Sequence, residues 1–195
     1  MKDNKLQESQ KWLEDHSKGV IGSELVTSTL EGLQVVASHE GFFRCHFLVP
    51  SSLLDQRGNW HIGAIATLID SVGAATAHSL FGPIRASVDF IISYFSTAKF
   101  QEEIEIEAKA VRGQGKLVGF MVEVKRKGSG ELIAIGSAWK LARRSDSHEE
   151  IEIEAKVVGN QGKLIAFRVE VRKKSSGELI AIGKQWMAIS SGKAK

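Results

Sequence analysis

The feature that most constrains the fold of this chain is an internal repeat in its second half. Residues 102–139 recur at residues 149–186 without a gap, and 27 of the 38 aligned positions are identical. The identical positions include glutamates and lysines of the kind that strands expose to solvent, and structural constraint alone does not preserve such residues one by one. We interpret the repeat as a tandem duplication, so the fold must accommodate the same unit twice.

Each repeat is predicted to form a three-stranded β-meander. From Ile104 to Ala108 apolar residues alternate with glutamates, at the two-residue period of a half-buried strand. The glycine-containing segments 113–116 and 127–130 separate this run from two further strand-like runs, as hairpin turns do. The second repeat has the same order of strands and turns.

The two repeats compete for one place in a sheet, because nearly identical meanders pair with the same neighbouring strands. The first repeat has a short connection to the preceding strand, whereas the second must loop out the first before it docks, which costs closure entropy. We therefore predict that residues 149–191 form an added antiparallel unit outside the domain. The alternative is that this unit is partly disordered or exchanged between subunits.

The rest of the chain predicts strands around one long helix. A helical rhythm at 5–17 is expected to form an N-terminal cap, 33–38 and 42–49 have strand patterns, 61–80 predicts a helix, and 86–95 predicts a strong strand. This order of strands, central helix and four more strands indicates an α+β fold. The predicted organisation is an N-terminal helical cap or arm at 1–29, a domain at 30–142, and a β-meander appendage with a tail at 143–195.

The predicted central helix carries one carboxylate, Asp70. At 100° per residue Asp70 shares a stripe with small residues, while Ile65, Leu68 and Val72 lie on the opposite side. A helix that is apolar nearly all round is expected to be buried, and small neighbours leave room beside the carboxylate for a ligand or another backbone. From the residues alone two interpretations stay open, a satisfied core carboxylate and a catalytic group.

Composition disfavours several classes of function. The formal net charge is +3, and Lys and Arg alternate with Glu along strand-like runs instead of clustering with aromatic residues, so nucleic acid is not an expected partner. The histidines lack metal-ligand spacing, and no phosphate loop or nucleophile elbow is found.

The same sequence gives expectations about location. The single cysteine, Cys45, has no intramolecular partner and favours a reducing compartment. The polar N-terminus does not resemble a signal peptide, and no apolar run is expected to span a membrane. We therefore expect a cytoplasmic location, with a peroxisomal or other organellar one left open.

The segment from Gly58 to Asp70, GNWHIGAIATLID, resembles the central-helix motif of hotdog-fold thioesterases of the acyl-CoA thioesterase 13 and phenylacetate-pathway type. The motif of that family is His-Gly-Gly, several residues, and then Leu-x-Asp on the central helix. The run 86–89, ASVD, together with Tyr94, resembles the strand that follows this helix in the same family. The resemblance covers roughly residues 30–142.

The resemblance implies a hotdog fold, in which an antiparallel sheet wraps round one long central helix, and the hydrolysis of a fatty or aromatic acyl-CoA to the free acid and CoA. It implies no cofactor, because CoA is part of the substrate. It also implies a homodimer or a dimer of dimers, with the active site between subunits.

By position, the resemblance assigns the following roles. The backbone N–H of Ile62 or Gly63, at the positive end of the helix dipole, polarises the thioester carbonyl. Asp70 acts across the dimer interface as general base or nucleophile, and Ser87 positions the water from the other side of the site. His61 orients the loop at the helix start, and Tyr94 and Lys116 lie near the bound CoA.

Two positions depart from the family pattern. Ile62 stands where the family has the first glycine of the pair, and Asp55 stands where it often has Asn or Gln to hold the carbonyl; an ionised carboxylate only accepts hydrogen bonds. Gln56 or Asn59 would have to take over that role. These departures motivate one rival hypothesis, a non-catalytic acyl-CoA-binding module, and the competing repeats motivate another, a chain that folds poorly and has no activity.

Overall fold

The computed structural model describes residues 3–84, 86–112, 117–141, 150–161 and 164–188 of the 195-residue chain. Its internal contacts divide the chain into two units, Met1–Arg144 and Ser145–Lys195. The first unit contains every site residue predicted from the sequence, and the second contains the second repeat.

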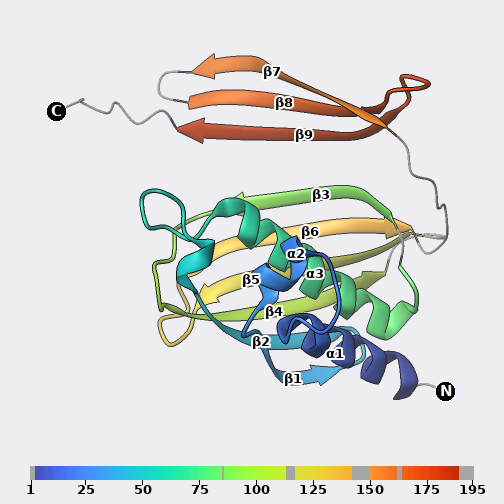
Figure 1. The fold of residues 1–195 in the computed structure, drawn as a ribbon, viewed down its shortest axis with the longest axis vertical. Coiled ribbons are helices and arrows are strands. Elements are labelled where there is room, and N and C mark those ends of the chain that lie inside the picture. Colours follow the sequence, from blue (N-terminus) through green and yellow to red (C-terminus); the bar gives the residue numbers. More distant parts are fainter. Residues whose placement is uncertain (1–2, 85, 113–116, 142–149, 162–163, 189–195) are drawn as a thin grey trace. The chain divides into compact units, whose positions relative to one another are not determined.

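A six-stranded antiparallel sheet forms one layer of the first unit (Figure 1). In spatial order its strands are β1 (Gln34–His39), β2 (Phe42–Leu48), β4 (Glu103–Arg112), β5 (Leu117–Arg126), β6 (Leu132–Leu141) and β3 (Ala86–Tyr94). The first repeat supplies the three adjacent strands β4, β5 and β6. Among the described strands, β3 pairs only with β6 and is therefore an edge of the sheet.

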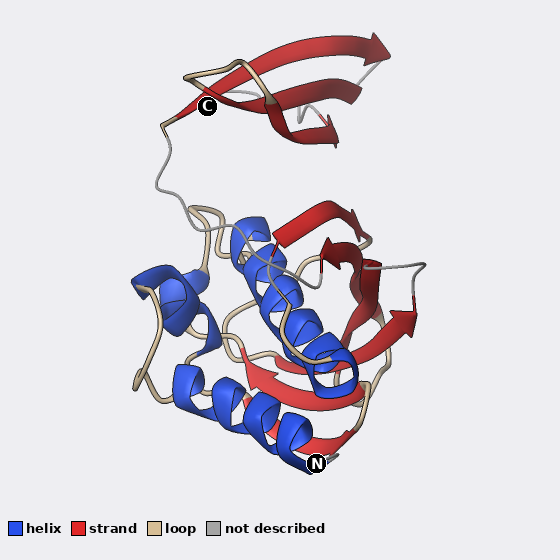
Figure 2. Ribbon diagram, turned by 90° about the vertical axis from the view of Figure 1, so that its right-hand side faces the viewer, coloured by secondary structure: helices blue, strands red, loops and turns tan. Residues whose placement is uncertain are grey.

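The central helix α3 (Ile62–Phe81) packs across this sheet and contacts β2, β4, β5 and β6 (Figure 2). Its apolar side, which includes Ile65, Leu68, Ile69 and Val72, is at most 1% exposed. Burying each such side chain contributes roughly 1.5–3 kcal/mol relative to leaving it exposed. The stripe of Asp70 lies away from this side, as the helical spacing predicts.

Two glycines allow α3 to approach the sheet closely. A Cβ atom added at Gly73 of α3 would overlap the ring of Phe120 on β5, and one added at Gly136 of β6 would overlap the side chain of Ile69. The first unit therefore selects glycine on both sides of the contact between helix and sheet.

Two N-terminal helices lie against α3. Helix α1 (Asp3–Ser17) buries Leu13 completely and agrees with the helical rhythm of the sequence. Helix α2 (Glu24–Leu30) is not predicted by the sequence, because ELVTSTL is short and contains two threonines and a serine, which favour helices weakly. Short helices depend on tertiary packing, which α2 obtains by burying Leu30 and contacting α1 and α3.

The expectation that no apolar run reaches the length of a membrane span needs correction for α3. By length and composition alone, this 20-residue helix is apolar enough to cross a membrane. In the structure 61% of its most apolar window is buried inside the first unit. The composition of α3 is therefore that of the core helix of a domain.

The second unit contains a three-stranded antiparallel sheet, in the order β7 (Ile151–Gln161), β8 (Leu164–Lys173) and β9 (Leu179–Ala188). Its strands pair almost as the first repeat does: Val118 opposite Lys140 corresponds to Ile165 opposite Met187, and the irregularity after Val124 recurs at the corresponding place. The two repeats thus specify nearly the same local pairing.

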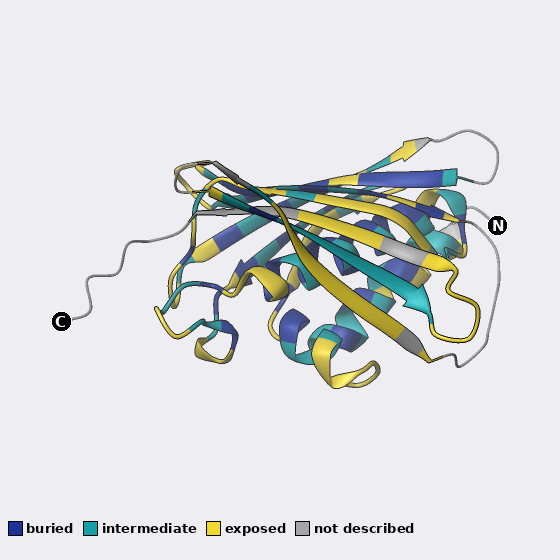
Figure 3. Ribbon diagram, turned by 90° about the horizontal axis from the view of Figure 1, so that it is seen from above, coloured by how far each residue is buried: buried dark blue, intermediate teal, exposed yellow. Residues whose placement is uncertain are grey.

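The environments of the two sheets differ. Ile106 of β4 is fully buried, whereas its counterpart Ile153 of β7 is 63% exposed. Figure 3 draws β7 to β9 mostly in the exposed and intermediate colours. The predicted α+β architecture, with one long central helix and an additional C-terminal meander, is confirmed.

Candidate active site

Helix α3 begins at a side-chain cap. His61 is the N-cap residue, and its Nδ1 accepts a hydrogen bond from the Gly63 N–H at 3.0 Å. The hydroxyl of Tyr94, at the end of β3, donates to the Ile62 carbonyl at 3.1 Å, and burial raises the pKa of Tyr94, which keeps the hydroxyl a donor. The amides of Ile62 and Gly63 therefore lie at the positive end of the helix dipole, where a carbonyl oxygen is polarised.

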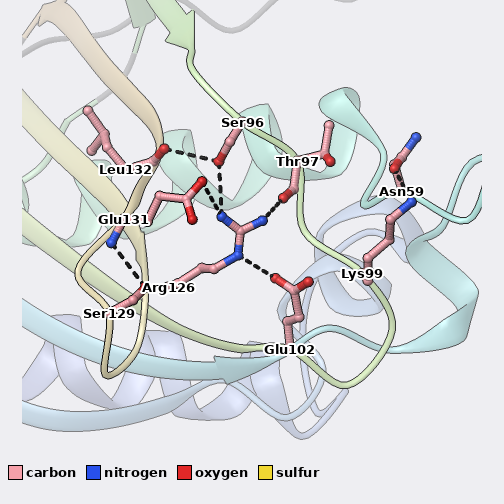
Figure 4. Close-up of polar contacts among 9 residues, drawn as sticks. All are labelled: Asn59, Ser96, Thr97, Lys99, Glu102, Arg126, Ser129, Glu131 and Leu132. Carbon is pink, nitrogen blue, oxygen red and sulfur yellow. Dashed lines mark hydrogen bonds and ion pairs between the residues drawn. The ribbon is translucent and has the colours of Figure 1, made fainter.

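Asp55 and Asn59 fix the loop that leads into α3. Asp55 Oδ1 accepts the backbone N–H of Asn59 at 2.9 Å and that of Arg57 at 2.8 Å. These hydrogen bonds, that of Asn59 foremost, hold the pKa of Asp55 below its ordinary value. Asn59 Oδ1 in turn accepts from Lys99 Nζ at 2.5 Å, while Gln56 is exposed (Figure 4). Asp55 and Asn59 are thus occupied in shaping the loop.

A polar cluster around Arg126 holds the segment that follows β3 (Figure 4). The guanidinium contacts Glu102 at 2.8 Å and Glu131 at 2.6 Å, and it donates to the Ser96 hydroxyl and to the Thr97 carbonyl. These contacts tie the β5–β6 hairpin to the segment that carries Lys99. Lys99 in turn donates to Asn59, so these contacts are linked to the loop that precedes α3.

Asp70 and Ser87 share one partner, Lys140 of β6. Lys140 Nζ lies 2.8 Å from Asp70 Oδ1 and donates to Ser87 Oγ at 3.0 Å. The side chain of Lys140 is only 8% exposed, whereas that of Asp70 is 41% exposed. Lys140 therefore connects α3, β3 and β6 from a nearly buried position, whereas Asp70 is partly exposed.

The two carboxylate oxygens of Asp70 differ in environment. Oδ1 has almost no accessible surface and no partner in hydrogen-bonding geometry among the described residues, so its contact with Lys140 is an ion pair and not a directed hydrogen bond. Since Oδ1 is covered, the exposed surface of the side chain belongs to its other atoms. Oδ2 is the oxygen placed to meet a ligand.

A cavity of about 310 Å³ lies between α1 and α3. Its walls come from Glu8, Ser9 and Trp12 of α1, from Ala74, Ala75 and His78 of α3, and from Ile84. Ala74 follows Asp70 by one helical turn on the same side of α3. The cavity thus begins one turn along the helix from the carboxylate.

Metal ligands and reactive thiols are not features of the described part of the chain. In residues 3–84, 86–112, 117–141, 150–161 and 164–188, no group of three His, Cys, Asp or Glu side chains is placed to hold a metal ion. Cys45 is buried, which raises its pKa to about 12. Its thiol is therefore protonated and a poor nucleophile at neutral pH.

The structure sorts the predicted site residues into three places. His61, Ile62, Gly63 and Tyr94 meet at the start of α3, Asp55 and Asn59 form the preceding loop with Gln56 at its surface, and Asp70 and Ser87 meet at Lys140. Lys116 lies outside the described residues. Ser87 thus approaches Asp70 from the same protomer.

Comparisons with known proteins identify the family. The model of the thioesterase superfamily matches residues 57–133. The mouse acyl-coenzyme A thioesterase 13 is 36% identical over 109 residues, which span 55% of this chain and 77% of the mouse protein. This chain belongs to the thioesterase superfamily.

Solved structures of the superfamily agree with this membership. Mouse thioesterase superfamily member 2 matches with a TM-score of 0.60 and 27% identity, over 70% of this chain and 96% of the mouse chain. The zebra fish member 2 matches with a TM-score of 0.62 and 24% identity, over 69% and 98% of the two chains, and shows the fold alone. The predicted hotdog fold is confirmed.

Within the superfamily match lie the start of α3, Asp70, Ser87 and Tyr94, whereas Lys140 lies beyond it. Lys140 is the residue that sequence reasoning missed. It follows Ala134, Gly136 and Ala138 at the two-residue period of the buried row of β6. A lysine at the end of a row of buried positions requires a buried partner. This pattern in the sequence is the signal that points to Lys140.

Proposed function

We propose that this chain hydrolyses acyl-CoA thioesters to the free acid and CoA. The observation that carries the proposal is the asymmetric carboxylate of Asp70, whose Oδ1 is covered and paired with Lys140 while the side chain as a whole is 41% exposed. The mouse relative, which is named an acyl-coenzyme A thioesterase, supports this choice of substrate.

The reaction proceeds by general-base attack of water. Asp70 Oδ2 takes a proton from a water molecule, whose oxygen bonds to the thioester carbonyl carbon. The N–H groups at the start of α3 stabilise the negative oxygen that forms. Either the Gly63 N–H exchanges its hydrogen bond to His61 for one to this oxygen, or the Ile62 N–H is the donor. Collapse breaks the C–S bond, and the CoA thiolate leaves with the proton from Asp70.

The site requires a second copy of the chain. Gly63 and Asp70 are seven residues apart on one helix, which separates them by about 10 Å at about 1.5 Å per residue. One protomer therefore does not bring its own amides and its own carboxylate to the same carbonyl carbon. We propose that the amides of one protomer face Asp70 of its partner in a homodimer, or in a dimer of dimers.

We propose that the cavity between α1 and α3 receives the fatty or aromatic acyl group. Its walls include Trp12, Ile84 and the small side chains of Ala74 and Ala75, so it offers apolar surface one turn from the proposed base. Apolar cavities with a few polar groups are typical binding sites for small ligands. A panel of short, long and aromatic CoA esters measures this preference directly.

A non-catalytic acyl-CoA-binding module is the second candidate function. It is favoured by the start of α3, where the side chain of Ile62 is 44% exposed at the family's glycine position and the Gly63 N–H is already used by His61. Saturable binding of CoA esters without release of thiol from any ester of the panel identifies such a module.

Replacement of Asp70 by Asn tests the hydrolysis. The amide keeps the shape of the side chain but takes up no proton, so we expect kcat to fall at least tenfold, within the range of general-base contributions. Free CoA is measured by thiol release, and the circular dichroism spectrum reports the fold. Asp15→Asn is the control, because Asp15 is a partly exposed carboxylate that forms an ion pair with Lys11 of its own helix α1, apart from the contacts of Asp70. Wild-type turnover in Asp70→Asn removes the carboxylate from the mechanism.

A further inference from the structure

Lys140 is a nearly buried cation directly beneath the proposed catalytic carboxylate. Its ammonium group lies 2.8 Å from Asp70 Oδ1, 3.0 Å from Ser87 Oγ and 5.7 Å from the centre of the Phe120 ring. These partners stand on α3, β3 and β5, while Lys140 itself stands on β6. A single side chain thus links four elements at one point.

The contacts of Lys140 match what a buried ammonium requires. Removing a lysine from water is costly unless its charge is compensated and its N–H groups find acceptors. Asp70 supplies the opposite charge, Ser87 supplies an acceptor, and the face of the Phe120 ring attracts the cation. The site therefore stabilises a positive charge at a fixed position and not a mobile surface lysine.

The second repeat indicates that the strand itself does not need this lysine. Met187 occupies the corresponding position of β9, and the pairing of Ile165 with Met187 reproduces that of Val118 with Lys140. Strands β8 and β9 have the same lengths as β5 and β6 and pair with each other in the same register. The function of the charge must therefore be sought in what lies above β6 in the first unit, namely Asp70 and Ser87.

We propose that Lys140 is a positioning residue for thioester hydrolysis. Its charge fixes Oδ1 of Asp70 and so directs Oδ2 toward the attacking water. By donating to Ser87 Oγ, it also turns the hydroxyl hydrogen of Ser87 away from the ammonium, so that the hydrogen is free to bond the water oxygen. The inference rests on the proposed function, in which Asp70 Oδ2 takes the proton of that water.

The charge of Lys140 also matters when substrate binds. An acyl group that covers Asp70 displaces the water that solvates its carboxylate, and the ammonium beneath it then compensates the negative charge. Both partners are present before binding, so no rearrangement is needed during the reaction. Misplacement of a reacting group by about 1 Å is able to cost roughly a hundredfold in rate.

A double-mutant cycle tests the proposal. The variants are Lys140→Met, which introduces the residue of the second repeat, Asp70→Asn, and the combination of both, all in the full-length chain. We expect Lys140→Met to lower kcat by about tenfold to a hundredfold with less than about threefold change in KM, because the lysine orients the base and does not contact the substrate. In the Asp70→Asn background the same substitution is expected to change kcat by less than about twofold.

Each outcome of the cycle decides one claim. Wild-type kcat in Lys140→Met overturns the inference, and so does a further loss of the same factor on top of Asp70→Asn, which shows that the lysine acts independently of the carboxylate. Wild-type turnover in Asp70→Asn contradicts the proposed mechanism instead, whatever Lys140→Met does.

Folding of the variants is controlled with a second substitution. Lys140→Gln keeps a polar but shorter side chain without the charge, and its kcat is expected to fall as that of Lys140→Met does. Circular dichroism and the melting temperature are measured for both. If neither variant folds, the lysine is a requirement of the fold, and the positioning role is overturned.

Discussion

At the scale of single residues, Asp55 and Asp70 are two partly exposed carboxylates with different partners. Asp55 accepts two backbone N–H groups of its own loop, whereas Asp70 faces one ammonium and has a side chain that is 41% exposed. The first arrangement uses the charge to hold a turn, and the second leaves the charge available for chemistry. This contrast explains why Asp55 does not replace the amide side chain that the family often has at its position.

The charge of Asp55 makes the stability of the loop depend on pH. Because the folded-state pKa of Asp55 lies below its ordinary value of 3.8, its contribution is complete above that value and is lost as the pH falls through the folded-state pKa. Asp55→Asn keeps a neutral acceptor and removes only the charge. We expect the variant to melt below the wild type at pH 7 and the difference to shrink below about pH 3.8. A difference that stays constant from pH 7 to pH 3 contradicts this.

Sequence reasoning reached Asp70 but not Lys140, and the reason is physical. A lone carboxylate among small residues on an apolar helix is visible as a local pattern. The contact of Lys140 with Asp70 depends on how far α3 lies along β6, which no local pattern encodes. Likewise, the engagement of the Gly63 N–H by His61 depends on a ring orientation that only the folded loop determines.

At the scale of secondary-structure elements, β5 and β8 show how the same strand pattern behaves in two environments. On β5, Phe120 and Val122 are at most 1% exposed beneath α3. The corresponding residues of β8, Phe167 and Val169, are only half-buried. The pattern of alternating residues therefore fixes the strand and its pairing, while burial depends on whether a helix covers the sheet.

A matched pair of glycines tests this difference. Gly136 of β6 and Gly183 of β9 occupy the same position of the two repeats, but an added Cβ would overlap Ile69 at the first and would lie 3.8 Å from Val169 at the second. We expect Gly136→Ala to lower the free energy of unfolding by about 1–3 kcal/mol, as overpacking of a core does.

The measurement is urea denaturation followed by circular dichroism, with Gly183→Ala as the control. Since the Cβ at 183 makes only ordinary contacts, that variant is expected to unfold at the wild-type concentration of urea. Equal effects of both substitutions contradict the packing of α3 on the first repeat.

Most elements of the fold follow from sequence periodicity, and the exception is instructive. The strands at 33–38, 42–49 and 86–95 and the helix at 61–80 agree with β1, β2, β3 and α3 within one or two residues. Helix α2 was missed because its stability comes from Leu30 packing into the domain and not from its own seven residues. The local sequence pattern therefore predicts elements that carry a full apolar face. It does not predict a short helix whose stability depends on packing against other elements.

At the scale of the whole molecule, the edge strand β3 is the surface that the proposed homodimer would use. Val88, Ile91 and Phe95 are each more than half exposed on or beside it. An unpaired strand edge with exposed apolar residues is a template for pairing with another chain. Pairing there would also bring the neighbouring Ser87, and through it Asp70, close to the second protomer.

Replacement of Ile91 by Lys tests the dimer. A lysine on an edge strand opposes pairing with a second chain, so we expect the variant to elute as a monomer in gel filtration and to lose thioesterase activity together with the dimer. Val36→Lys on the opposite edge strand β1 is the control, because Val36 is also exposed. A dimeric and active Ile91→Lys protein contradicts the proposed interface.

The matching registers of the two repeats also bear on how the chain acquires its structure on the ribosome. The second repeat begins 47 residues after the first. At about 5–20 residues per second, translation gives the first repeat a lead of roughly 2–9 s, which exceeds the folding time of most small domains. During synthesis the strands of the first repeat are therefore able to pair with β2 before the second repeat has been made. In a chain refolded from denaturant both repeats are present from the start, so both compete to pair with β2.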